Sequence, residues 1–313
     1  MAEYLITGGA GFIGSHLVEA LAKEGRKIAV IDNFLTGKNE NIAPFASKIE
    51  FFQGDIRDRE LLKKALTGIR IVFHEAALPS VPRSIKDPWS THQNNVEGTL
   101  NLLIACREAG VQRVVYAGSS SAYGNTPILP KVETLAPNPC SPYAASKLAG
   151  EHYCQVFTKV YGLETVILRY FNVFGPRQDP NSTYAAVIPK FIVSLLNNRP
   201  SIIYGDGEQS RDFTYIDNVV AANLLAAQAN NVAGQVFNIA CGQQTSLNQI
   251  LDFLAKFLGK TKDACYQEYR SGDVLHSVAD IGLAKQYLNY IPKVCVYEGL
   301  EKTALWFQQS ERK

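Results

Sequence analysis

The sequence predicts an α/β fold: a parallel sheet covered by helices on both faces, with a smaller carboxyl-terminal α/β lobe. Three observations predict this fold. Short apolar runs alternate with amphipathic helical stretches over the first 170 residues, a glycine-rich turn follows the first run, and the alternation loosens beyond that point. Strands that alternate with helices indicate βαβ units and a parallel sheet. We therefore expect a doubly wound sheet of the Rossmann type.

The expected elements follow one another in a regular order. In the first part, strands are expected at Tyr4–Ile6, Ile28–Ile31, Ile49–Phe52, Ile71–Phe73, Val111–Ala117 and Thr165–Arg169, and helices at Phe12–Leu21, Asp58–Leu66, Asn95–Ala109 and Pro142–Tyr161. Further on, helices are expected at Ala185–Leu196, Ile216–Ala229 and Leu247–Leu258, and a strand at Val236–Ile239. We expect that last strand to return to the main sheet. We expect two domains, the first of residues 1–170 and the second a lobe of residues 171–313. Within the second range, residues of about 213–240 are expected to return to the first domain.

The glycine-rich turn is the first candidate binding site. Gly8, Gly11 and Gly14 follow the first apolar run, and a helical stretch that begins with Phe12 and Ile13 overlaps them. Without side chains, the backbone N–H groups and the positive end of the helix dipole can approach a pyrophosphate. The turn therefore predicts a dinucleotide site.

An acidic residue ends the second expected strand. The carboxylate of Asp32 can accept hydrogen bonds from ribose hydroxyls and would repel a 2′-phosphate, which favours NAD over NADP. Asp32-Asn33 is also good turn chemistry, so a simple Asx turn is the alternative interpretation. Asn33 and Gly37, in the loop that follows, are included in the expected cofactor site.

Two further strand ends contribute to the expected cofactor site. Asp55 and Ile56 follow the third strand, where a carboxylate could reach the adenine. Ala76 and Ala77 follow the fourth strand, in the segment His74-Glu75-Ala76-Ala77, and their small side chains would let a nicotinamide ribose lie close. Open α/β sheets bind ligands at the carboxyl ends of their strands.

Tyr143 and Lys147 are the candidate catalytic residues. They lie one turn apart at the start of an expected helix. A free tyrosine has a pKa of about 10, and a neighbouring ammonium favours its phenolate. Ser119 and Ser121 end the fifth strand, where hydroxyls could relay the proton of a substrate hydroxyl.

The composition excludes several classes of protein. The net charge is +2 without a basic cluster, so neither nucleic acid nor a membrane surface is expected as a partner. No apolar stretch reaches the roughly 18 to 20 residues that span a bilayer. Because the first expected strand begins by Tyr4, we expect no cleaved signal peptide. Six cysteines and five histidines show no metal-ligand spacing, so we expect reduced thiols, no metal and a cytoplasmic location.

On these motifs the chain resembles an extended short-chain dehydrogenase/reductase of the NAD-dependent epimerase/dehydratase family. The resemblance implies that Tyr143 is the active-site base, Lys147 its partner and Ser119 the catalytic hydroxyl, with Ser121 a second substrate contact. It also implies that Asn95 is the family's structural asparagine beneath the cofactor site. The implied cofactor is NAD.

The second half of the chain resembles nucleotide-sugar 4-epimerases, and most of all the bacterial UDP-N-acetylglucosamine 4-epimerases. The segments that carry this resemblance are Ser80–Ser84, Arg169–Pro176, Arg177–Asn181, Tyr184–Lys190, Gln209–Phe213 and Arg270–Ser277. The resemblance implies that Tyr170 contacts the cofactor. The implied contacts to the UDP-sugar are Ser80, Arg83, Asn172, Arg177, Gln178, Ala186, Val187, Arg211, Arg270, Asp273 and Ser277. Arg211 and Arg270 would clamp the pyrophosphate, because planar guanidinium groups suit bidentate phosphate contacts.

The implied reaction is inversion at C4 of a UDP-hexose through a transient 4-keto sugar. Ser277 is small where epimerases restricted to glucose and galactose carry a tyrosine, which leaves space for a 2-acetamido group. Pro79 and Leu275 depart from the family pattern, where a glycine and an arginine are usual, so the preferred UDP-hexose stays open. The resemblance also implies a homodimer in which the Asn95–Ala109 and Pro142–Tyr161 helices form a four-helix bundle.

Three alternatives are weighed against this interpretation. A 4,6-dehydratase is disfavoured, because such relatives place Asp-Glu directly after the catalytic hydroxyl, where Ser120 and Ser121 stand here. Epimerisation or decarboxylation of a UDP-uronic acid is harder to exclude, since Arg83 or Arg177 could meet a C6 carboxylate. An NAD(H)-sensing protein without turnover is the non-enzymatic alternative, and the intact Tyr143 speaks against it.

Overall fold

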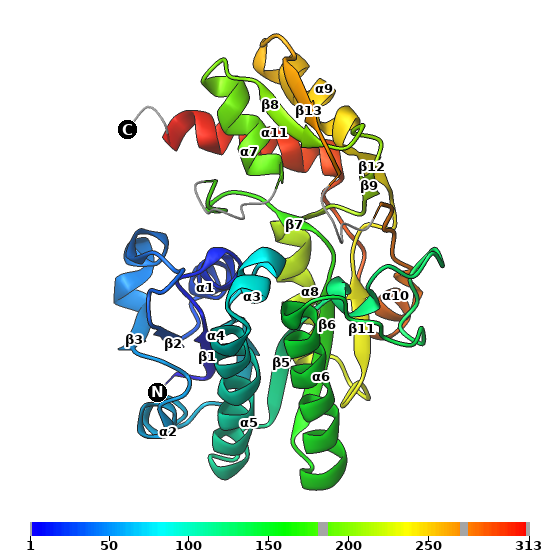
Figure 1. Cartoon of the computed structure of the whole chain (residues 1–313). Helices are drawn as coiled ribbons and strands as arrows, with labels where there is room; N and C mark the ends of the chain where they lie inside the picture. Colours follow the sequence, from blue (N-terminus) through cyan, green and yellow to red (C-terminus); the bar gives the residue numbers. More distant parts are fainter. Residues whose placement is uncertain (1, 181–186, 270–274, 311–313) are drawn as a thin grey trace.

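A seven-stranded sheet forms the centre of the computed structural model, which describes residues 2–180, 187–269 and 275–310 (Figure 1). The strands are β1 (Tyr4–Thr7), β2 (Ile28–Asp32), β3 (Ile49–Gln53), β4 (Ile71–His74), β5 (Arg113–Ser119), β6 (Glu164–Tyr170) and β11 (Val236–Ile239). All pairs are parallel, in the order β11-β6-β5-β4-β1-β2-β3. The predicted Rossmann-type sheet is confirmed, and the strand expected at 236–239 joins its edge. The order reverses between β1 and β4, where such sheets bind ligands.

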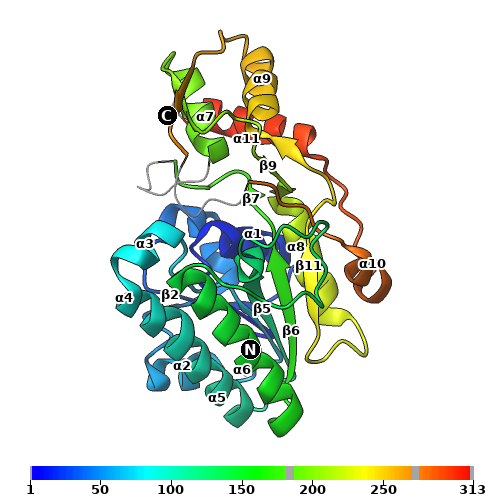
Figure 2. The ribbon, with the colours of Figure 1, turned by 45° about the vertical axis from the view of Figure 1, so that its right-hand side comes forward.

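Helices cover both faces of the sheet (Figure 2). One face packs against α1 (Phe12–Lys23) and α8 (Ile216–Gln228), and the other against α2 (Arg59–Ala65), α5 (Gly98–Glu108) and α6 (Pro142–Tyr161). Successive strand residues point to opposite faces, so Leu5 joins one apolar cluster and Ile6 the other. Because both faces are covered, the strands are continuous apolar runs rather than alternating ones.

Strands β8 (Ser201–Tyr204) and β13 (Ala264–Gln267) and helices α7 (Val187–Leu196), α9 (Leu247–Leu258) and α11 (Val296–Ser310) lie beyond the carboxyl ends of the sheet strands, at the top of Figure 1, whereas α10 (Gly282–Leu288) lies beside β11. The strands outside the main sheet pair as β7 (Val173–Phe174) with β10 (Thr214–Tyr215), β9 (Ser210–Arg211) with β12 (Thr245–Ser246), and β8 with β13. Helices α7, α9 and α11 pack together. Phe191 and Leu254 belong to the same apolar cluster as Ile216 of α8, so one core runs from the sheet into this part.

Several boundaries differ from those expected. Strand β5 begins at Arg113 rather than Val111, and a π-helical turn at Gln93–Glu97 precedes α5. Short helices α3 (Val81–Lys86) and α4 (Pro88–His92) were not expected, and 3₁₀ turns lie at Asn39–Asn41, Ala43–Lys48 and Ser120–Tyr123. The first two residues of the helix expected at Ala185–Leu196 lie outside the described residues. None of the described helices is both long and apolar enough to cross a bilayer.

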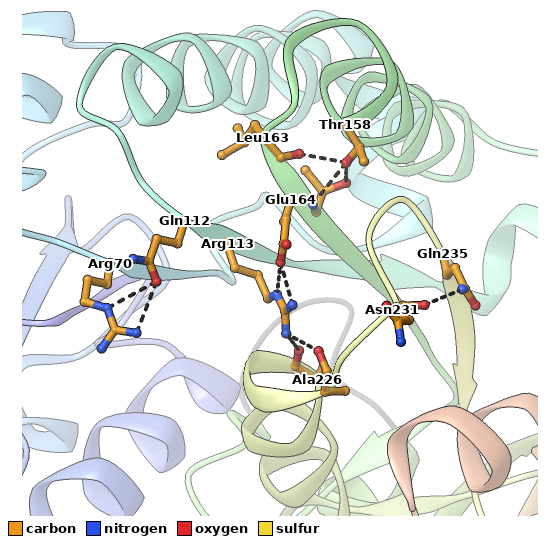
Figure 3. Close-up of polar contacts among 11 residues, drawn as sticks. Arg70, Gln112, Arg113, Thr158, Leu163, Glu164, Ala226, Asn231 and Gln235 are labelled. Atoms are coloured by element: carbon orange, nitrogen blue, oxygen red, sulfur yellow. Dashed lines mark hydrogen bonds and ion pairs between the residues drawn. The ribbon is translucent and has the colours of Figure 1, made fainter.

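The opposite end of the sheet is closed by polar contacts (Figure 3). Arg113 at the start of β5 binds Glu164 at the start of β6, with 2.5 Å between Nη2 and Oε2. The same guanidinium donates to the carbonyl oxygens of Ala226 and Ala229, at 2.9 and 2.7 Å, at the end of α8. This arginine therefore satisfies helix carbonyls and joins two strands at the end remote from the site.

Candidate active site

The turn between β1 and α1 has no room for side chains. Gly8 has a φ of +70°, and a Cβ there would lie 2.8 Å from Cα of Ala76. A Cβ on Gly14 would lie 2.2 Å from the carbonyl oxygen of Gly8. Gly11 is the N-cap of α1, so the N-cap residue offers no side chain to its first N–H groups. The turn is therefore a glycine cradle that presents backbone donors, as a pyrophosphate site requires.

Asp32 organises the other side of this turn. Its carboxylate accepts hydrogen bonds from the backbone N–H of Ala10 at 2.9 Å and of Phe34 at 2.8 Å. Burial raises the pKa of Asp32, and these two backbone hydrogen bonds oppose the rise. A Cβ on Gly37 would lie 2.8 Å from each carboxylate oxygen, so the 33–37 loop passes directly over the acid. Asn33 in this loop donates to Asp55 at 2.9 Å.

A cavity of about 230 Å³ runs along the carboxyl ends of the strands at the switch point between β1 and β4. It is lined by most of the predicted cofactor residues: Gly8, Gly11, Phe12, Ile13, Gly14, Asp32, Asn33, Asp55, Ile56, Ala76, Ala77, Tyr143, Lys147 and Tyr170. Gly37 and Asn95 are not among the described residues that line it. The elements thus bring together residues from six separate segments.

Asn95 is buried next to this cavity and makes hydrogen bonds to the segment that lines it. Its Oδ1 accepts from the N–H of Leu78 at 2.7 Å, and its Nδ2 donates to the carbonyl of Leu78 at 3.1 Å and to Ser146 at 3.0 Å. The side chain therefore fastens the segment after β4 to α6. Its neighbour Asn94 lines the cavity instead.

Tyr143 lies in the first turn of α6, where Ser119 reaches it from the end of β5. The two side chains are hydrogen-bonded, and Oγ of Ser119 lies 2.8 Å from Oγ of Ser121. Burial raises the pKa of Tyr143, the hydrogen bond from Ser119 lowers it, and the negative charge of Glu75 raises it. A hydroxyl relay from Ser121 through Ser119 to Tyr143 is therefore in place.

Lys147 lies one helical turn further along the same face. Burial lowers the pKa of Lys147 to about 8, while the nearby charge of Glu75 opposes the fall. Its Nζ is 4.7 Å from the ring centroid of Tyr116, whose hydroxyl donates to the carbonyl of Lys147 at 3.1 Å. We expected this ammonium to favour the phenolate form of Tyr143. In the structure the pKa of Tyr143 responds to burial, Ser119 and Glu75.

A second cavity, of about 620 Å³, opens beside the first. Its lining includes Ser119, Ser121, Tyr143, Asn172, Gln178, Arg211 and Ser277 among the predicted substrate residues. The two cavities share Phe12, Ile13, Pro79, Gly118, Tyr143 and Tyr170 in their linings. A cofactor in the first cavity and a substrate in the second would therefore meet beside Tyr143.

A third pocket, of about 240 Å³, extends this region toward α7. Asn172, Val187 and Arg211 line it, and Nδ2 of Asn172 donates to the carbonyl of Asp212 at 3.0 Å. Arg211 donates to the carbonyl of Leu275 at 2.8 Å. These hydrogen bonds fix the side chains of Asn172 and Arg211, which line both the second and the third pocket.

Other predicted substrate residues lie elsewhere. Ser80 caps α3 by accepting from the N–H of Arg83 at 3.2 Å. Arg177 binds Glu19 and, at 3.3 Å, Ser15 on α1. Among the described residues, the linings of the three pockets include none of Ser80, Arg83 and Arg177. Ala186, Arg270 and Asp273 lie outside the described residues.

Glu75 is a lining residue to which the sequence analysis gave no role. It belongs to the segment after β4, of which only the two alanines were expected to matter. Its carboxylate accepts a hydrogen bond from the hydroxyl of Tyr170 at 2.8 Å. The signal that could have found it is its place at the carboxyl end of a strand beside the switch point.

Comparison with known proteins agrees with this geometry. The model of the NAD dependent epimerase/dehydratase family matches residues 4–240. The chain belongs to this family. Within it, the chain is 37% identical to the UDP-glucose 4-epimerase of Mycolicibacterium smegmatis, over 98% of this chain and 99% of that protein.

Solved structures of family members are similar over almost the whole chain. The UDP-N-acetylglucosamine 4-epimerase of Methanobrevibacter ruminantium superposes with a TM-score of 0.94 at 42% identity, covering 99% of this chain and 100% of the other. The UDP-glucuronic acid 4-epimerase of Bacillus cereus, in complex with UDP-glucuronic acid and NAD, superposes with a TM-score of 0.92 at 37% identity, covering 98% and 99%. Members that act on different UDP-sugars thus share this architecture.

The family's cofactor, NAD, fits the first cavity. The glycine cradle suits a pyrophosphate: a Cβ at Gly8 or Gly14 would collide with the backbone of Ala76 or Gly8, so glycines are needed for the tight turn that lets the backbone approach the phosphates. The carboxylate of Asp32, at the end of β2, lines the same cavity and suits ribose hydroxyls rather than a 2′-phosphate.

Proposed function

We propose that the protein is an NAD-dependent UDP-sugar 4-epimerase that interconverts UDP-N-acetylglucosamine and UDP-N-acetylgalactosamine, and also UDP-glucose and UDP-galactose. The observation that carries this proposal is the place of Tyr143. It is hydrogen-bonded to Ser119 where the cofactor cavity and the second cavity meet. A base at such a junction can take a proton from a hydroxyl whose carbon faces the cofactor.

The chain's own residues handle the proton in this reaction. The phenolate of Tyr143 would take the proton of the sugar 4-hydroxyl, and Ser119, which is hydrogen-bonded to Tyr143, would hold that hydroxyl. Tyr143 is neutral at rest because burial raises its pKa, and the ammonium of Lys147 together with the positive nicotinamide ring would favour its phenolate once the cofactor is bound. NAD, when bound, accepts the C4 hydride and supplies it again. After the 4-keto sugar turns over, Tyr143 returns the proton, and C4 is inverted without net oxidation.

Ser277 supports the acetamido sugars as substrates. Its small side chain lines the second cavity, which leaves space where a tyrosine would intrude. The departures at Pro79 and Leu275 lie nearby: Pro79 lines both cavities, and Leu275 is 51% exposed.

UDP-uronic acids are the second candidate substrates, because a UDP-glucuronic acid 4-epimerase has a similar structure. The two arginines considered for a C6 carboxylate do not favour it here. Arg177 is paired with Glu19, and Arg83 is outside the described linings of the cavities. We therefore place neutral UDP-hexoses first.

Proton NMR of the purified protein with UDP-N-acetylglucosamine and no added NAD tests the proposal. We expect UDP-N-acetylgalactosamine to appear and to reach a constant ratio, because the cofactor is retained through the cycle. Tyr143→Phe, which removes the base, should lower turnover by at least about 10²-fold. Near-wild-type turnover in that variant would contradict the assignment of Tyr143 as the base. If UDP-glucuronate were the only sugar turned over, the assigned substrates would be UDP-uronic acids instead.

We further propose that the two parts of the chain bind different ligands and that the protein is a homodimer. Residues 1–170, with about 213–240, would bind NAD, and the rest of residues 171–313 would bind the UDP-sugar. Helices α5 and α6 would pair with those of a second copy.

All six cysteines are free thiols, which supports action in the reducing cytoplasm.

A further inference from the structure

Glu75 is a partly buried carboxylate that the proposed reaction does not use. It follows β4 and lines the cofactor cavity together with Tyr143, Lys147 and Tyr170. Burying a carboxylate is costly, so a partner and a purpose are expected for it. Its carboxylate accepts a hydrogen bond from the hydroxyl of Tyr170, at 2.8 Å.

A directed chain of hydrogen bonds holds Glu75 as an acceptor. Nδ2 of Asn223, on α8, donates to the carbonyl of Val219 at 2.9 Å and to the hydroxyl oxygen of Tyr170 at 2.8 Å. Tyr170 then keeps its own hydrogen to donate. Its possible acceptors are Oδ1 of Asn223 at 3.1 Å and Oε1 of Glu75 at 2.8 Å, and the shorter contact to the charged group is preferred. The chain therefore favours the carboxylate form of Glu75.

The end of the cavity at which Glu75 lies is the reactive end. Tyr170 lines both cavities, as does Tyr143, whereas Asp32 lines the first cavity and is absent from the described lining of the second. Hydride can pass only where the two cavities meet. The oxidised nicotinamide ring carries a positive charge that it loses on reduction, so a fixed negative charge at this end interacts differently with the two forms.

We propose that Glu75 sets the redox poise of the bound cofactor, its negative charge stabilising NAD⁺ relative to NADH. Hydride is then returned to the keto sugar, and the protein is not left as an inactive NADH complex when a ketose escapes. The electron balance is internal, since the same two electrons move from C4 to the nicotinamide and back. This inference rests on the proposed function for its cofactor.

The other charged groups around Glu75 are consistent with this role. Lys147 on α6 is the neighbouring cation, and Tyr143 and Tyr170 are neutral at rest because burial raises both pKa values. His74 on β4 is neutral as well, since burial lowers its pKa to about 3. Burial raises the pKa of Glu75 to about 7, so the carboxylate dominates in mildly alkaline solution.

Glu75→Gln tests the inference, because it removes the charge and keeps an oxygen that can accept from Tyr170. The holoprotein, in mildly alkaline buffer, is equilibrated with a redox couple of known potential, and NADH is read from its near-ultraviolet absorbance. We expect the bound NAD⁺/NADH ratio to fall roughly tenfold, which is about 30 mV for a two-electron couple. Glu75→Asp keeps the charge and should stay within about threefold of the wild type.

Glu50→Gln, at an exposed position on β3, is the matched control for the loss of one charge. It should leave the ratio unchanged. A Glu75→Gln holoprotein with the wild-type ratio, or with a shift no larger than that of the control, would overturn the inference alone. A wild-type protein that binds no NAD would overturn the proposed function and the inference together.

Discussion

Thr7, His74 and Thr99 form a buried hydrogen-bonded chain beneath the cofactor cavity. The hydroxyl of Thr99 donates to the carbonyl of Asn95 at 2.7 Å, so it accepts from Nε2 of His74 at 2.9 Å. Nδ1 of His74 then accepts from the hydroxyl of Thr7 at 2.7 Å. The partners therefore select one neutral tautomer of the imidazole.

Protonation of His74 should make the fold sensitive to acid. Burial lowers the pKa of His74 from 6.5 to about 3 in the folded protein. Between these pH values the unfolded chain binds one more proton than the folded chain, so the free energy of unfolding falls as the pH falls. The contribution of this residue to the slope is at most about 1.4 kcal/mol per pH unit.

Denaturant unfolding of the wild type and of His74→Gln across this pH range checks the prediction. The variant has no imidazole to protonate, so its stability should depend less steeply on pH. Glu75 and Asp212, whose pKa values burial raises, act in the opposite direction in both proteins and cancel in the comparison. Equal slopes in the two proteins would contradict the prediction.

At the scale of elements, α6 carries the proposed catalytic residues Tyr143 and Lys147 and is anchored to β6 by an ion pair. Glu151 of α6 binds Arg169 of β6 through two contacts, of 2.6 and 2.9 Å. Both side chains are only 3% exposed, and the guanidinium lies 4.6 Å from the ring centroid of Tyr123. The pair therefore fixes the helix on the strand in a region without solvent.

Glu151→Gln should destabilise the fold by about 3–5 kcal/mol, because it leaves the guanidinium of Arg169 buried without its counter-charge. Glu164→Gln is the matched control. Glu164 pairs with Arg113 near the surface, is 48% exposed, and should contribute about 0–1 kcal/mol (Figure 3). The measurement is urea unfolding of both variants. Similar losses in the two would contradict the argument.

The sequence predicts α6 with its observed bounds because the signals that start and end this helix are local. Ser141 accepts a hydrogen bond from the N–H of Ala144, Pro142 opens the helix, and Gly162 ends it with a φ of +73°. By contrast, α3 and α4 are too short to show a period, and β7, β9, β10 and β12 are two-residue strands. Such elements depend on distant partners that no local pattern reveals.

The difference between local and long-range signals also explains which residues of the candidate site could be predicted from the sequence. Tyr143 and Lys147 are four positions apart on one helix, so their proximity is readable from the sequence. Arg177 was expected to contact substrate, yet it pairs with Glu19, which lies 158 positions away in the chain. Glu75 acquires its role from Tyr170 and Asn223, on other elements. Long-range contacts of this kind have no signature in the sequence.

At the scale of the whole molecule, α5 and α6 lie side by side on one outer face (Figures 1 and 2). On α6, Val156, Val160 and Tyr161 are 48%, 63% and 49% exposed. Val156 and Val160 are four residues apart and so share one side of the helix. A contiguous apolar stripe on a long surface helix is typical of a protein–protein interface.

Val160→Glu should convert the proposed dimer into a monomer, because it would bury two like charges near the two-fold axis of an apolar bundle. Ile202→Glu is the matched control, since Ile202 is 48% exposed on β8, in the other part of the molecule. Light scattering at micromolar concentration should give a dimeric mass for the wild type and the control, and a monomeric mass for Val160→Glu. A monomeric wild type would contradict the dimer itself. A dimeric Val160→Glu would leave the dimer standing and move its interface away from α6.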